Sequence, residues 1–86
     1  MARYTLVYTN TFDKDTIKLV KSNPSLKIKI EVTLKKLEVN PFDGRKVEGS
    51  GYWRVWVGDG HRLFYDVDRN NVVILHLRKK EKGTYK

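Results

Sequence analysis

Residues 52–78, YWRVWVGDGHRLFYDVDRNNVVILHLR, decide the fold, because they contain three runs of β-forming residues separated by two turn signals. The runs are Tyr52 to Val57, His61 to Asp68 and Asn71 to Arg78, and the turn signals are Gly58-Asp59-Gly60 and Arg69-Asn70. Glycine, aspartate and asparagine at such positions favour tight hairpins between antiparallel strands. The stretch therefore predicts a three-stranded antiparallel meander.

The register of the first hairpin follows from the length of its loop. A three-residue loop places Val57 opposite His61, and directly opposed residues share a face of the sheet. One face then carries the pairs Val55 with Leu63 and Trp53 with Tyr65, and the other carries Trp56 with Arg62, Arg54 with Phe64 and Tyr52 with Asp66. A shift by one residue would mix aliphatic and polar side chains on both faces. We therefore expect the first face to be the core and the second to face solvent.

Upstream of the meander, the sequence predicts a strand followed by a helix. Tyr4 to Thr9 alternates apolar and polar residues, as a half-buried strand does. Thr11 is a candidate N-cap for a helix that has acidic residues in its first turn and lysines in its last, the order that the helix dipole favours. The inner stripe of this helix would consist of Phe12, Thr16 and Leu19.

The segment Leu26 to Val39 carries two overlapping patterns. Its first residues alternate apolar and charged side chains, as a strand would. Over the whole segment, however, apolar residues recur at helical spacing, namely Leu26, Ile30, Leu34 and Leu37. Because strands are usually only about 5–6 residues long, the length favours a helix, with Ser25 as its N-cap and Asn40-Pro41 at its end.

These elements follow one another in the order β-α-α-β-β-β. Phe42 to Gly51 has turn residues at both ends and is expected to be a connecting loop, and the apolar run Val72 to Leu75 indicates that the last strand lies in the middle of the sheet. With 86 residues and no cysteine, the chain is expected to form one domain, residues 1–86, stabilised by packing. We predict an α+β fold in which the two N-terminal helices cover one face of a small antiparallel sheet.

The chain is strongly basic, with 18 lysines and arginines against 10 aspartates and glutamates and a net charge of +8. Such an excess on a folded domain is typical of proteins that bind a polyanion, most often nucleic acid, although acidic proteins and anionic membranes attract the same charge. No apolar run approaches the roughly 20 residues that span a bilayer, and the N-terminus lacks the apolar core of a secretion signal. We therefore expect a cytoplasmic protein with no membrane partner.

The side chains available for catalysis are chiefly Arg, Lys, His and Tyr. There is no nucleophile motif and no glycine-rich phosphate loop, and two histidines without a cysteine argue against a transition-metal site. RNA can supply its own nucleophile: the 2′-hydroxyl attacks the adjacent phosphorus once a base removes its proton, cations stabilise the phosphorane, and an acid protonates the leaving oxygen.

Arginines interleaved with aromatic rings suit single-stranded nucleic acid, because guanidinium groups hold phosphates and rings stack on bases. The alternative is structural. In that case the rings only cover the sheet, and the arginines pair with Asp66 or Asp68.

Three segments carry a resemblance to a known family: Asn40-Pro41-Phe42-Asp43-Gly44, Gly51-Tyr52-Trp53-Arg54 and His61-Arg62-Leu63-Phe64-Tyr65. A basic terminus that contains a tyrosine follows them. Together with the order of elements, they resemble the RelE/ParE superfamily of toxins from type II toxin–antitoxin systems, most closely its RelE and YoeB ribonuclease branches. The resemblance implies an mRNA interferase that cleaves messenger RNA in the A site of the small (30S) ribosomal subunit, without a metal or cofactor, and that a cognate antitoxin silences.

The resemblance also implies roles for individual residues. Arg62 matches the arginine that contacts the scissile phosphate, and Tyr85 matches the near-terminal tyrosine that stacks on or orients the substrate. The second arginine of the family has four candidates here, namely Arg78, Lys79, Lys80 and Lys82. We expect the catalytic residues to be Arg62, Tyr85, Lys79 and Arg78, and the RNA-binding residues to be Arg54, Lys46, Trp56, Phe64, Lys80 and Lys82.

Two histidine positions bear on the general acid. Thr84 stands where the YoeB pattern has a histidine, so the resemblance leaves the acid open. His61 precedes Arg62 as in that pattern, but the hairpin register turns it toward the core, and we expect it to be structural. The alternative functions are a ParE-like toxin, which shares the fold but binds DNA gyrase, and an inactive toxin that retains only its partners.

Overall fold

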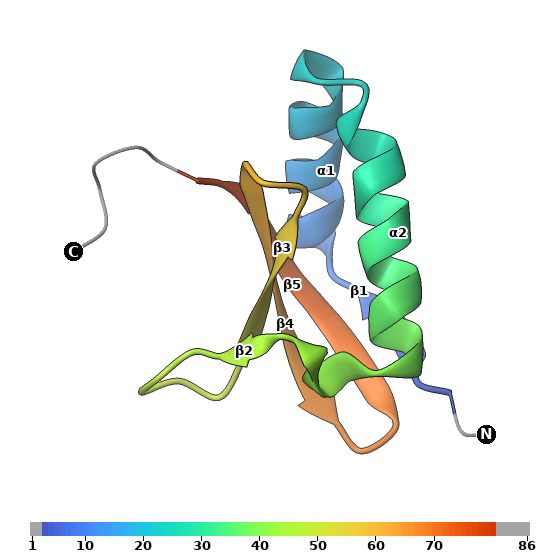
Figure 1. Ribbon diagram of the computed structural model, residues 1–86, viewed down its shortest axis with the longest axis vertical. Coiled ribbons are helices and arrows are strands. Elements are labelled where there is room, and N and C mark those ends of the chain that lie inside the picture. Colours follow the sequence, from blue (N-terminus) through green and yellow to red (C-terminus); the bar gives the residue numbers. More distant parts are fainter. Residues whose placement is uncertain (1–2, 81–86) are drawn as a thin grey trace.

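The computed structural model describes residues 3–80, which form two α-helices, a short 3-10 turn and a five-stranded sheet. In chain order the elements are β1 (Thr5–Tyr8), α1 (Asn10–Ser22), α2 (Leu26–Val39), the turn η1 (Pro41–Asp43), β2 (Arg45–Lys46), β3 (Trp53–Val57), β4 (His61–Asp68) and β5 (Asn71–Lys79). The two helices lie side by side and cover one face of the sheet (Figure 1). The predicted α+β architecture is confirmed. No helix within residues 3–80 is long and apolar enough to cross a membrane.

The strands lie in the order β1-β5-β4-β3-β2. Strands β3, β4 and β5 form the predicted antiparallel meander. The sheet as a whole is mixed rather than antiparallel, because β1 pairs parallel to β5. Such pairing is possible because the helices separate β1 from the rest of the sheet in sequence, so no tight hairpin constrains its direction. Strand β2, at the opposite edge, was expected to be loop, and two residues are too few to show a strand periodicity.

The register of the first hairpin is confirmed, with Val57 opposite His61, Val55 opposite Leu63 and Trp53 opposite Tyr65. Leu63 and Tyr65 are fully buried beneath the helices. The pairing of Tyr52 with Asp66 does not occur, since β3 begins at Trp53. Within residues 3–80, ten buried apolar residues form the core, from both helices and the three central strands: Phe12, Leu26, Ile30, Leu37, Val57, Leu63, Tyr65, Val72, Ile74 and Leu77.

His61 lies on the helix-facing side, as its register predicts. Burial, and then the nearby charges of Lys79 and Lys29, lower the pKa of its imidazole. Lys29 belongs to α2, so its influence is consistent with a ring that faces the helices rather than the opposite surface.

A β-bulge interrupts the pairing of β4 with β5. Phe64 pairs with His76 while Tyr65 pairs with Ile74, so Leu75 is an extra residue on β5. The bulge reverses the alternation of the strand. Leu77 therefore joins Ile74 in the core, and His76 takes the face that Phe64 occupies.

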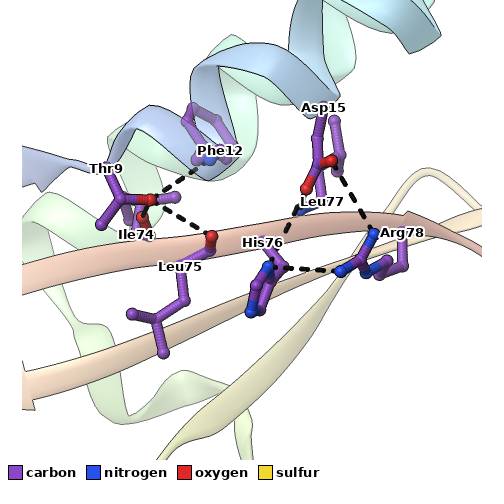
Figure 2. A network of polar contacts seen from close by, with 8 residues as sticks. All are labelled: Thr9, Phe12, Asp15, Ile74, Leu75, His76, Leu77 and Arg78. Atoms are coloured by element: carbon purple, nitrogen blue, oxygen red, sulfur yellow. Dashed lines mark hydrogen bonds and ion pairs between the residues drawn. The ribbon is translucent and has the colours of Figure 1, made fainter.

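Helix α1 follows β1 directly and contacts β5 beyond the point where β1 ends. Its N-cap is Thr9 rather than Thr11: the Thr9 hydroxyl accepts a hydrogen bond from the Phe12 N–H at 3.2 Å and donates to the Ile74 carbonyl at 2.8 Å. Further along, the Asp15 carboxylate accepts the Leu77 N–H at 3.2 Å (Figure 2). Because β1 ends at Tyr8, these side chains pair backbone groups of β5 that would otherwise form an open edge.

Thr9→Val is expected to lower the free energy of unfolding by about 1–2 kcal/mol, because the isosteric change removes both the helix cap and the anchor to β5. Urea denaturation followed by circular dichroism measures the difference. Thr11→Val is the matched control, since Thr11 is exposed and makes no cap. Equal effects of the two substitutions would contradict the assignment of the cap.

Helix α2 has the predicted bounds, and Leu26, Ile30 and Leu37 of its stripe are buried. Ser25 occupies the N-cap position, but its hydroxyl donates to the Asn23 side chain at 2.8 Å instead of capping the helix. After the helix, the Asn40 side chain accepts the Phe42 N–H at 3.2 Å and starts the turn η1. This turn leads the chain to β2, at the edge of the sheet.

Candidate functional site

A cleft of about 530 Å³ opens at the β2–β3–β4 side of the sheet. It is lined by Asp43, Gly44, Arg45, Arg54, Val55, Trp56 and Arg62. Three of these residues are arginines and one is an aspartate, so the cleft is electropositive. Its volume lies in the range of about 300–1,000 Å³ that small-ligand sites occupy. A phosphate group and an adjoining base would fit a cavity of this size and charge.

Arg62 is buried, with only 6 % of its surface exposed. The expectation that it lies on an open solvent face is wrong. Its guanidinium carbon lies 5.7 Å from the centre of the Trp56 ring and 5.9 Å from that of Phe64. Both rings lie close enough for cation–π attraction, which is strongest where the cation has lost water. The aromatic residues predicted to share the face of Arg62 therefore enclose it.

Other predicted site residues join Arg62 on this face. Arg62 lies between Trp56 on β3 and Arg78 on β5 in one row of paired residues. Lys80 places its ammonium nitrogen 5.4 Å from the centre of the Trp56 ring. Arg54 lies between Phe64 and Arg45 in the neighbouring row and lines the cleft. Six residues are thus brought together: Arg54, Trp56, Arg62, Phe64, Arg78 and Lys80.

Two predicted site residues lie apart from this group. Lys79 is paired with His61, in the row that faces the helices. Lys46 is paired with Trp53, whose ring packs edge-on against Phe42 at 5.5 Å between centroids. Alternation along a strand places both lysines on the opposite face from Arg62. Tyr85 and Lys82 lie outside the described residues.

Sequence reasoning missed Arg45 and left the face of His76 undecided, because the register of the last hairpin could not be assigned. Arg45 lines the cleft and pairs with Arg54, but its face depends on the short strand β2. His76 pairs with Phe64 on the face of Arg62, and its side depends on the bulge at Leu75. The face of either residue becomes known only once these irregular pairings are known.

The turn that carries Asp43 and Gly44 into the cleft is anchored from below by Tyr65. The Tyr65 hydroxyl donates to the Pro41 carbonyl at 2.6 Å. Burial raises the pKa of this phenol from 10.0 to about 12. Gly44 packs so closely on the backbone of Arg54 and on the Tyr65 hydroxyl that a Cβ would not fit. The core thus fixes one wall of the cleft.

Tyr65→Phe is expected to lower the free energy of unfolding by about 1–2 kcal/mol, because it removes the hydrogen bond to the Pro41 carbonyl. It also changes the pH dependence. The unfolded phenol ionises near pH 10.0 and the folded one near pH 12, so its stabilising contribution is complete below pH 10.0 and is lost as the pH rises through 12. Urea denaturation at pH 8, 10 and 11, within about two units of the unfolded pKa, measures this dependence. With rising pH, the free energy of unfolding should fall more steeply for the unsubstituted protein than for the variant.

The geometry suits recognition of a phosphodiester. Charge-assisted hydrogen bonds from arginines to phosphate are among the strongest polar contacts in proteins, and arginines held in a cavity need little rearrangement to stabilise a developing negative charge. Trp56 is about half exposed, so its ring can cover Arg62 and still present a face to a base. Base stacking on an aromatic ring contributes about 1–3 kcal/mol.

Comparison with known proteins identifies the family of the chain. The family model of the ParE toxin of type II toxin–antitoxin systems (parDE) matches residues 6–82. No curated protein matches the sequence at a significant level.

Among solved structures, the RelBE2 toxin–antitoxin complex of Mycobacterium tuberculosis contains a chain with 28% sequence identity and a TM-score of 0.78, over 93% of this chain and 94% of that one. The YoeB-YefM complex of Staphylococcus aureus has 24% identity, a TM-score of 0.72 and coverage of 93% and 100%. The DinJ-YafQ complex of E. coli has 18% identity, a TM-score of 0.72 and coverage of 88% and 91%. Because the family model extends over nearly the whole chain, the protein belongs to the family of ParE toxins of type II toxin–antitoxin systems, within the RelE/ParE superfamily.

Proposed function

We propose that this toxin is an endoribonuclease that cleaves messenger RNA in the ribosomal A site and thereby inhibits translation in the cytoplasm. The observation that supports the proposal most is the placement of Arg62, enclosed by Trp56 and Phe64 and lining a cleft with Arg45 and Arg54. A toxin that only binds a protein surface has no need of a desolvated arginine surrounded by further arginines. A nuclease needs one, because a buried cation stabilises a phosphorane more strongly than an exposed one.

In the proposed reaction, the 2′-oxygen of the RNA attacks the adjacent phosphorus while the bond from phosphorus to the 5′-oxygen breaks. The proton leaves the 2′-hydroxyl for a base, and an acid supplies a proton to the leaving 5′-oxygen. The products are a 2′,3′-cyclic phosphate and a 5′-hydroxyl. Arg62 contacts the scissile phosphate, Arg54 and Arg45 neutralise its charge, and Trp56 stacks on a base.

The remaining residues take supporting roles in this proposal. Arg78 serves as the second arginine, because it shares the face and the row of Arg62, whereas Lys79 lies on the other face. Phe64 and Lys80 complete the RNA-binding surface beside Trp56. Tyr85 is expected to stack on or orient the substrate, with Lys82 nearby in sequence, and Lys46 contributes only general positive charge. Arginine side chains supply the charge stabilisation, so the proposed reaction requires no metal or cofactor.

The proposed partners are the ribosome with its messenger RNA and a cognate antitoxin. Two of the structural neighbours, those from Mycobacterium tuberculosis and E. coli, are toxin–antitoxin complexes. By similarity to them, we expect an antitoxin to bind this chain. A net charge of +8 favours an acidic partner segment.

Primer extension tests the nuclease. Purified protein is added to a translation reaction and to the same messenger RNA without ribosomes. We expect cuts at codon positions only while ribosomes translate, and 5′-hydroxyl termini at the cuts. Intact RNA at a toxin concentration that saturates the ribosomes would contradict the proposal.

A gyrase-directed toxin is the second candidate, favoured by the ParE family model that the chain matches. It predicts inhibition of gyrase supercoiling with messenger RNA left intact. The two assays therefore separate the candidates. If both are negative and expression does not slow growth, the chain is an inactive toxin that retains only its binding partners.

A further inference from the structure

A carboxylate on α1 contacts the site from the β5 edge. Asp15 lies 3.8 Å from the guanidinium of Arg78 and 4.0 Å from the imidazole of His76, measured between the nearest nitrogen and oxygen atoms. The second terminal nitrogen of Arg78 lies 3.5 Å from Nδ1 of the same imidazole. Figure 2 shows the three side chains grouped where α1 crosses the end of β5.

Asp15 is the fixed member of this group. Its side chain is 18 % exposed, whereas those of His76 and Arg78 are 41 % and 56 % exposed. Its Oδ2 atom also accepts the Leu77 N–H at 3.2 Å, a bond to the sheet itself. A largely buried carboxylate that is hydrogen-bonded to the backbone can orient a longer and more mobile side chain that reaches it.

Arg78 needs such a partner because it is paired with Arg62 on the neighbouring strand. Like charges directly opposite one another destabilise a sheet. Without a counter-charge, the more exposed guanidinium would turn away into solvent. Asp15 supplies that counter-charge on the β5 side, so the two guanidiniums are held at separate positions along one row.

The contact with Arg78 also bears on His76. When Arg78 donates to Nδ1, the neutral imidazole must carry its hydrogen on Nε2. The Nε2–H group then points away from Arg78, on the face that His76 shares with Phe64. This group of side chains would thus present two hydrogen-bond donors beside the cleft, the charged guanidinium of Arg78 and the neutral imidazole of His76.

We propose that Asp15 is a positioning residue of the site, which holds Arg78 and His76 so that an RNA strand crossing the sheet meets Arg62 and Arg78 as two separately held cations. This role deepens the proposed RNA cleavage and rests on it. Asp15 itself does not contact the RNA. Its loss should weaken substrate binding more than it slows the chemical step.

Asp15→Asn is the informative variant, because the amide oxygen can still accept the Leu77 N–H while the charge is lost. We expect this variant to fold. The KM for ribosomes programmed with messenger RNA should rise about fivefold, the effect of losing one partly exposed charge pair, and kcat should change less than twofold. In the Arg78→Gln background, Asp15→Asn should have no further effect. Asp13→Asn, an exposed carboxylate on the same helix, is the matched control and should leave KM unchanged.

A second measurement does not depend on cleavage. The Nε–Hε resonance of Arg78 in an ¹⁵N NMR spectrum should be sharp and slow to exchange in the unsubstituted protein and in Asp13→Asn, but broadened in Asp15→Asn. An unchanged Arg78 resonance in Asp15→Asn, or a KM increase that persists in the Arg78→Gln background, would overturn the positioning role. If the unsubstituted toxin cleaves no RNA, the proposed nuclease fails instead, and the Arg78 resonance still decides what Asp15 does.

Discussion

Replacing Arg62 with methionine is expected to lower the rate of RNA cleavage by about 10²–10³-fold, the effect of removing one preorganised donor from an oxyanion site. The effect is large because Arg62 is the most enclosed of the cleft arginines, at 6 % exposure. Its charge is poorly screened by water. Single-turnover cleavage on ribosomes programmed with messenger RNA measures the chemical step directly.

Methionine is preferred to alanine because the Arg62 side chain is also part of the packing. Its guanidinium carbon lies 5.7 Å from the centre of the Trp56 ring and 5.9 Å from that of Phe64, and truncation to alanine would remove the packing against both rings. We expect Arg62→Ala to lose stability as well as activity, whereas Arg62→Met keeps an unbranched chain of similar volume. Thermal unfolding by circular dichroism separates the two effects.

The control for charge alone is Lys21→Met, which removes one exposed positive charge at the end of α1. It should cleave at the rate of the unsubstituted toxin. A folded Arg62→Met protein with the same rate would rule out Arg62 as the residue on the scissile phosphate. Arg54 or Arg45 would then be the next candidate, since both line the same cleft.

The face of each residue on β3 and β4 could be predicted from the sequence because one feature determines it. The loop Gly58-Asp59-Gly60 allows a single register in which the aliphatic side chains share a face, and the structure has that register. The row that contains Trp56 and Arg62 followed directly. The burial of Arg62 could not be predicted. Two rings on neighbouring strands can lie flat over a cation or stand away from it, and their rotamers depend on tertiary packing.

The faces of His76 and Arg78 could not be predicted in the same way. The bulge at Leu75 reverses the alternation of β5, and an all-apolar run such as Val72 to Leu75 shows no alternation from which a bulge could be inferred. The contact of Asp15 with β5 is equally invisible in the sequence. It arises because β1 is shorter than β5 and leaves an edge that α1 covers.

Gly44→Ala is expected to lower the free energy of unfolding by about 2–4 kcal/mol and to reduce cleavage as well. An added Cβ would lie 2.6 Å from the Arg54 carbonyl oxygen and would overlap the Tyr65 hydroxyl. Neither neighbour can give way cheaply, because one is strand backbone and the other is a fully buried ring. The cost combines overpacking with the loss of the buried bond from Tyr65 to Pro41.

The same displacement would move Asp43 and Arg45, which flank Gly44, away from β3 and so widen the cleft that they line. Urea denaturation gives the stability change, and single-turnover cleavage at a temperature where the variant is fully folded gives the functional one. Gly51→Ala is the matched control, because nothing lies within 4 Å of a Cβ there. If Gly44→Ala were destabilised yet cleaved at the normal rate, Arg45 would not act on the phosphate, because the turn that places Arg45 cannot accept a Cβ without shifting.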